Sequence, residues 1–109
     1  MVVFHIVAFK TRSATGLQAL REAFLALPQT CLHPVTGQPY IQIARGGRQM
    51  STEGKDRGMQ VCFVMEFENE DDLAYYLDKD PVHEDFKNKA GGEWETLDVV
   101  AMDFNEGVF

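Results

Sequence analysis

Two histidines of this 109-residue chain stand where an imidazole could carry out acid–base chemistry. His5 lies in the apolar run Phe4–Lys10, and His83 follows Asp80–Pro81 at the start of an expected helix. An apolar setting disfavours the charged imidazolium, so a neutral ring could act as a base near pH 7. If both rings faced one pocket, one could remove a proton next to a carbonyl group while the other donated to the developing oxyanion.

A tyrosine pair precedes the second histidine and could add a neutral donor for a carbonyl oxygen. Tyr76 shares the inner helix face with Leu73 and Leu77, so we favour it over Tyr75. Each candidate also has an ordinary structural interpretation. His5 could be a hydrogen-bonded core residue, His83 could cap and solvate a helix start, and Tyr76 could simply pack in the core. The residues alone leave both interpretations open.

The overall composition excludes several classes of partner. With 17 acidic and 10 basic residues the chain carries a net charge of −7, which disfavours nucleic acid and anionic membranes. The first apolar run is short and has no basic segment before it, so we expect a strand and no signal peptide. No run approaches the roughly 20 apolar residues of a membrane span. Cys31 and Cys62 form no zinc motif, and free thiols suit a cytosolic address.

The hydrophobic pattern predicts four strands in one domain that spans residues 1–109. The strands are expected at 3–10, 40–45, 59–68 and 94–104. Within 59–68, Val61, Phe63, Met65 and Phe67 alternate with Cys62, Val64 and Glu66, which is typical of a sheet with one buried face. Gly46–Gly47 are expected to stop the second strand.

Two helical regions separate these strands. A capping box at Thr15–Gln18 opens the first helix, and Pro28 is expected just past its end. Asn69 caps the second region, which restarts at Asp80–Pro81 because aspartate is a good N-cap and proline suits the first helical position. The inner face of the restarted piece is expected to carry Val82, Phe86 and Ala90.

The order β-α-β-β-α-β gives an α+β, ferredoxin-like fold, in which a four-stranded antiparallel sheet carries its helices on one face. The opposite face would expose apolar side chains over on the order of several hundred Å², which is too much for a typical monomer. They are Phe4, Ile6, Cys62, Val64, Val100, Met102 and Phe104. A two-fold homodimer that stacks the open sheet faces would cover them.

Four segments of the chain resemble the stress-responsive α/β-barrel (Dabb) family. They are His5–Lys10, Ser51–Gly54, Tyr76–Phe86 and the ending Asp103–Phe109, the last of which looks like fungal members. The resemblance implies a dimeric α+β barrel with a pocket between sheet and helices. It also implies a relation to a plant polyketide cyclase that performs an aldol condensation with pocket histidines and a tyrosine. His5 and His83 match positions of that pocket, whereas Val61 stands where the cyclase has a further histidine.

These observations lead to two functional hypotheses, beside a purely structural role in which the pocket is vestigial. The first is a cofactor-independent enzyme of the cyclase, aldolase or dehydratase type, in which His5, His83 and Tyr76 are catalytic and no metal is needed. The second is a non-catalytic, stress-responsive dimer that binds an apolar ligand. In both, an apolar or aromatic small molecule would contact inward-facing side chains. These are Val7, Phe9, Phe24, Leu27, Val61, Phe63, Met65, Leu73 and Phe86.

Overall fold

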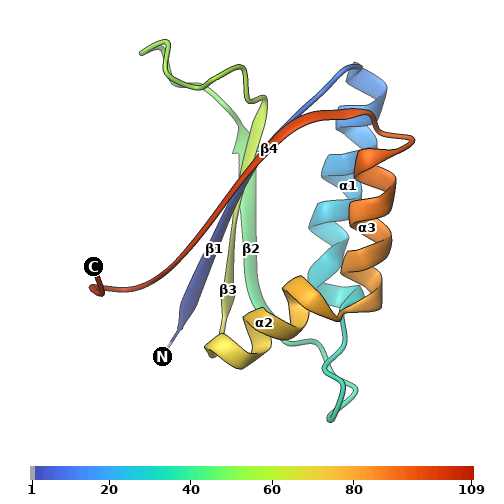
Figure 1. The fold of residues 1–109 in the computed structure, drawn as a ribbon, viewed down its shortest axis with the longest axis vertical. Coiled ribbons are helices and arrows are strands. Elements are labelled where there is room, and N and C mark those ends of the chain that lie inside the picture. The colour runs from blue at the N-terminus through green and yellow to red at the C-terminus, as the bar shows by residue number, and fades with distance from the viewer. Residues whose placement is uncertain (1) are drawn as a thin grey trace.

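A computed structural model describes residues 2–109 and confirms the ferredoxin-like α+β fold. The strands and helices are β1 (Val3–Thr11), α1 (Ala14–Thr30), β2 (Ile41–Arg48), β3 (Val61–Phe67), α2 (Glu70–Asp78), α3 (Pro81–Gly91) and β4 (Thr96–Asn105). All neighbouring strands are antiparallel, and the sheet order is β2-β3-β1-β4. The helices cover one face of the sheet and leave the other bare (Figure 1).

The two central strands alternate strictly between a buried and an open face. In β3, Phe63 and Met65 are buried while Cys62 and Val64 are exposed, as the sequence pattern predicts. β1 alternates in the same way, and the face toward the helices includes His5. A strand whose register is fixed by burial places every second residue under the helices. His5 is therefore an inward-facing residue.

Helix α1 departs from the expected boundaries at both ends. The N-cap is Ser13, whose hydroxyl accepts a hydrogen bond from the Gly16 backbone at 3.0 Å, so the expected cap at Thr15 is wrong. Pro28 lies inside the helix, not past its end. The last turn survives because the Cys31 backbone N–H donates to the Leu27 carbonyl at 2.9 Å and both side chains are buried. Packing here overrides the helix-breaking tendency of proline.

Strand β2 also runs further than expected, because Gly46 and Gly47 lie within it. Gly46 pairs with Phe63 in β3, and the Phe63 ring occupies the space that a side chain on Gly46 would need. That ring stacks on Phe24 of α1 with 4.0 Å between ring centroids. A glycine is therefore needed for β2 to pass beside this buried aromatic pair, and it does not end the strand.

The junction between α2 and α3 is held by a buried carboxylate. Asp80 caps α3 as expected, and its Oδ1 accepts hydrogen bonds from the backbone N–H groups of Val82 and His83 at 2.9 and 3.3 Å. Its Oδ2 accepts a third bond from the Tyr40 hydroxyl at 2.5 Å. The tyrosine ties the start of β2 to the start of α3, and burial raises its pKa. These bonds fix the start of α3 and, with it, the position of His83.

Strand β4 is exposed along nearly its whole length, unlike the other three. On the bare face, Val100, Met102 and Phe104 are at least 40% exposed, and Phe104 stacks on Phe4 of β1 at 4.8 Å. On the helix side, Val99 is 50% exposed. Within residues 2–109, no helix has the length and apolar character needed to cross a bilayer.

Replacing Gly46 by alanine is expected to destabilise the protein by about 1–3 kcal/mol, because its Cβ would clash with the Phe63 ring and lie 2.8 Å from the Cys62 carbonyl oxygen. Urea unfolding measures the change. Gly47→Ala is the matched control, since nothing lies within 4 Å of the added carbon. Equal effects of the two substitutions would contradict this account of β2.

Candidate functional site

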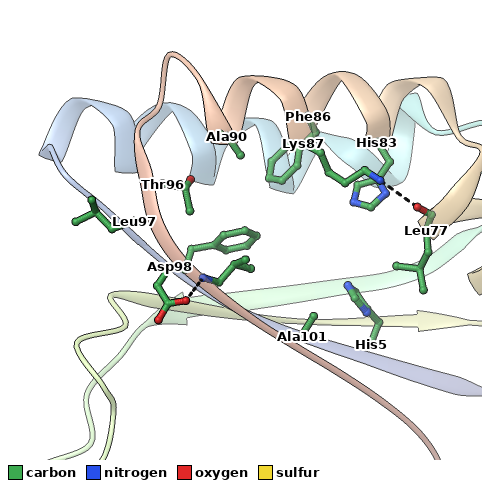
Figure 2. Close-up of a pocket in the computed structure, with 13 residues that line it drawn as sticks. His5, Leu77, His83, Phe86, Lys87, Ala90, Thr96, Leu97, Asp98 and Ala101 are labelled. Carbon is green, nitrogen blue, oxygen red and sulfur yellow. Dashed lines mark hydrogen bonds between the residues drawn. The ribbon is translucent and has the colours of Figure 1, made fainter.

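A cavity of about 560 Å³ lies between the helices and β4. It is on the helix-covered face of the sheet, in the part that α1 does not cover. Most of its wall is apolar and includes Phe9, Leu77, Phe86 and Val99. His5 enters from the sheet and His83 from α3, at the same end of the cavity (Figure 2). A largely apolar cleft with a few converging polar groups is the usual form of a small-molecule site.

His5 forms a side-chain pair with Asp103 that the sequence analysis missed. The two residues lie directly opposite each other in the β1–β4 ladder, and His5 Nδ1 is 2.5 Å from Asp103 Oδ1. A carboxylate accepts hydrogen bonds, so the imidazole donates a hydrogen from Nδ1 and its second nitrogen, Nε2, is not used in this pair. The His5 side chain is almost fully buried, and that of Asp103 is about one-third exposed. The arrangement matches the base and orienting carboxylate of a catalytic triad.

His83 is held in the same tautomer by a different partner. Its Nδ1 donates to the Tyr76 backbone carbonyl at 2.7 Å, near the C-terminal end of α2. The residue is buried, whereas Val82, expected on the inner face, is only half-buried. Burial lowers the pKa of His83 below its usual 6.5, the nearby Lys87 and His5 add to this, and the carbonyl bond opposes it. His83 is therefore neutral at pH 7, with a free lone pair on Nε2.

Tyr76 packs between the two imidazoles. Its ring stacks on His83 at 3.8 Å between centroids and meets His5 edge-on at 5.9 Å. Its buried hydroxyl has no hydrogen-bond partner among residues 2–109 and does not line the cavity. Burial raises the pKa of this hydroxyl, and the nearby Cys31 and Asp80 side chains raise it further. The ring of Tyr76 thus positions the histidines, while its hydroxyl is directed elsewhere.

The structure divides the expected lining residues into two groups. Phe9 and Phe86 line the cavity. The remaining seven are buried in the packed core under α1 and α2 and do not line it: Val7, Phe24, Leu27, Val61, Phe63, Met65 and Leu73. Alternation identifies inward-facing residues, but it does not tell which half of the sheet is filled by a helix.

Several cavity residues were not expected, because they come from β4 and from the outer side of α3. They are Lys87, Gly91, Thr96, Leu97, Asp98, Val99 and Ala101. Glu84 and Asp85, which adjoin His83 in sequence, point outward instead and pair with Lys87 and Lys89 at 3.0 and 3.1 Å. The three neighbouring residues His83, Glu84 and Asp85 therefore do not share one site.

Comparison with known proteins identifies both the family and the fold. The model of the Stress responsive A/B Barrel Domain matches residues 3–106. No curated protein matches the sequence. A crystal structure from Arabidopsis thaliana shares 19% identity with a TM-score of 0.78, over 98% of this chain and 97% of that one. The hydroxynitrile lyase of Passiflora edulis shares 15% identity with a TM-score of 0.76, over 98% and 96%. A dimeric ferredoxin-like protein of Thermobifida fusca shares 19% with a TM-score of 0.70, over 95% and 90%.

The lowered pKa of His83 makes stability depend on pH. Above its ordinary pKa of 6.5, His83 is neutral in both the folded and the unfolded chain. As the pH falls below 6.5 the unfolded chain binds a proton first, so the free energy of unfolding falls until the folded protein also protonates. We expect His83→Gln to remove this part of the decline. Urea unfolding at several pH values between about 5 and 8 measures it.

An unchanged pH dependence in His83→Gln would contradict the neutral, buried state of His83. The imidazole ¹⁵N chemical shifts provide a second readout that does not depend on stability. They should report hydrogen on Nδ1 of His83 at pH 7, as the bond to the Tyr76 carbonyl requires.

Proposed function

The chain belongs to the stress responsive A/B barrel domain family, and we propose that its cavity is the active site of a cofactor-independent enzyme. The reaction class is proton transfer next to a carbonyl group, which covers cyclases, aldolases and dehydratases. The observation that carries this proposal is the His5–Asp103 pair, which holds a free imidazole nitrogen at the polar end of an apolar cavity.

His5 is the proposed general base. Its Nε2 would remove the acidic proton of the substrate, and the Asp103 carboxylate on Nδ1 would stabilise the imidazolium that forms. The same imidazolium then returns the proton to the product. A positioned base of this kind contributes about 10²–10⁴-fold to a rate. Burial of the His5 ring keeps bulk water from competing for that proton.

His83 is the proposed second polar group in contact with substrate. Its Nδ1 hydrogen is committed to a carbonyl, so the neutral ring presents an acceptor at Nε2. It can hold a substrate hydroxyl or take the proton of that hydroxyl, as carbon–carbon bond cleavage beside an alcohol requires. Tyr76 is a positioning residue in this scheme, because its ring contacts both imidazoles.

The substrate is proposed to be an apolar, carbonyl-containing molecule, aromatic or acyl in character. The walls formed by Phe9 and Phe86 suit such a group. The similar fold of a protein named hydroxynitrile lyase supports lyase chemistry on this scaffold. A non-catalytic binding protein is the second candidate, which the same apolar walls favour.

Two unpaired cysteines suit a reducing compartment, and we propose the cytosol as the location.

We also propose that the bare sheet face is the interface of a homodimer. The exposed Val64, Val100 and Met102 lie together on that face, where water contact is unfavourable. Several proteins of similar fold are described as dimeric. Stacking two such faces about a two-fold axis buries the same residues on both copies.

The acid–base proposal can be tested without the natural substrate. In D₂O, the protein should catalyse exchange of the α-hydrogens of 2-acetylnaphthalene, which fits the apolar walls and contains an acidic C–H next to a carbonyl. We expect His5→Gln to lower this rate by about 10²–10⁴-fold. Asp103→Asn should lower it by at least tenfold, because the imidazolium loses its carboxylate partner. Proton NMR follows the exchange.

Asp98→Asn is the matched control, since Asp98 also lines the cavity but its side chain accepts its hydrogen bond from the Val99 backbone and not from His5. It should leave the exchange rate within about twofold of the wild type. Binding of 2-acetylnaphthalene without exchange above background would favour the non-catalytic candidate. Equal losses in Asp98→Asn and Asp103→Asn would show that the His5–Asp103 pair has no special role.

Sedimentation velocity tests the dimer. The wild-type chain is expected to sediment as a dimer at micromolar concentration, and Met102→Asp should shift it to a monomer by placing a charge in the apolar interface. Leu25→Asp is the control, because Leu25 is 47% exposed against 58% for Met102 but lies on α1, away from the bare sheet face. A monomeric wild-type protein, or a dimer that only Leu25→Asp disrupts, would contradict this interface.

A further inference from the structure

The cavity wall contains a single cationic side chain among residues 2–109, that of Lys87. It lies one helical turn beyond His83 on α3, so the two side chains are neighbours on the helix surface. Figure 2 shows Lys87 extending along α3 toward the Leu77 carbonyl, beside His83. The proposed acid–base mechanism does not use this ammonium group.

The present partners of Lys87 leave it available to a ligand. Its Nζ donates to the Leu77 carbonyl at 3.1 Å and pairs with Glu84 at 3.0 Å. An ammonium group has three hydrogens, so one donor remains after these two contacts. The Lys87 and Glu84 side chains are 45% and 57% exposed, and such a surface pair contributes little to stability. A ligand anion can therefore bind to Lys87 without a large loss of stability, even if it weakens the pair with Glu84.

We propose that Lys87 determines substrate specificity by binding a carboxylate, so that the substrate class is apolar carbonyl compounds that carry a carboxylate group. The apolar part would lie against Phe9 and Phe86, and the reacting carbonyl would lie next to His5 and His83. This inference rests on the proposed function only for the position of the reacting carbonyl. The carboxylate site itself rests on Lys87 and on the apolar walls around it.

The charge of the rest of the chain makes Lys87 decisive for such a ligand. The protein carries a net charge of −7, and Asp98 is the second charged group in the cavity wall. An anion entering this apolar space loses water and gains nothing from the neutral walls. The remaining Lys87 hydrogen replaces that water with a charge-assisted hydrogen bond. Without Lys87, the cavity should therefore prefer neutral molecules.

The test compares 2-naphthoate with 2-naphthamide, two probes of nearly the same shape that differ in charge. Isothermal titration of the full chain should show naphthoate binding about tenfold more tightly, the effect of one charged hydrogen bond. Lys87→Met should abolish this preference. Lys87→Gln should do so as well, although its amide can still donate to the Leu77 carbonyl and preserve the end of α2.

Lys89→Met is the matched control, because Lys89 is on the same helix, pairs with Asp85 and does not line the cavity. It should keep the wild-type preference. Equal affinities of the two probes in the wild type, no binding of either, or a preference retained in both Lys87 variants would overturn the proposal. His5→Gln should lose α-hydrogen exchange but keep the naphthoate preference. Failure of the acid–base mechanism is therefore distinguishable from failure of the carboxylate site.

Discussion

The buried carboxylate of Asp80 is the interaction on which the site depends. It ends the turn after α2 and begins α3 by accepting the Val82 and His83 N–H groups, and it holds Tyr40 through its second oxygen. A carboxylate this deep in the protein is tolerated only because both oxygens are hydrogen-bonded. The position of α3 then follows from a side-chain bond as well as from apolar packing. The positions of His83 and Lys87 therefore depend on this bond. Each of these side chains donates a hydrogen bond to a backbone carbonyl near the end of α2.

The uneven cover of the sheet explains why a cavity exists at all. α1 packs against β1 and β2, where the stacked Phe24 and Phe63 rings fill the space between the layers. Within residues 2–109, β4 makes its extensive contacts with β1, and its inner residues face α3 across the cavity. An edge strand with neither face covered would be poorly stabilised alone, but β4 is held by its ladder with β1. That ladder also brings Asp103 to His5, so one strand pairing stabilises the edge and assembles the proposed base.

Local patterns in the sequence were sufficient to predict the order of helices and strands. The features that were mispredicted or missed depend on tertiary contacts. The alternation in β3, the Asn69 cap and the Asp80–Pro81 start all depend on neighbouring residues, and these predictions are confirmed. Pro28 was mispredicted because the buried Leu27 and Cys31 hold the last turn of α1. Gly46 was mispredicted because its role depends on Phe63 in another strand. Asp103 was missed for a similar reason, since its partner lies 98 residues away. Counting an antiparallel register between the first and last strands could have found it. Nothing in the sequence indicated which half of the sheet stays uncovered.

The two imidazoles share a tautomer but differ in what their partners allow. His5 faces a carboxylate, which stabilises a proton gained at Nε2. Burial, together with the nearby Lys87, favours the neutral form of His83, although its bond to the Tyr76 carbonyl opposes this. In the proposed mechanism these partners give the two rings different roles, because His5 carries the proton while His83 stays an acceptor. Tyr76 contacts both rings and thereby sets their separation.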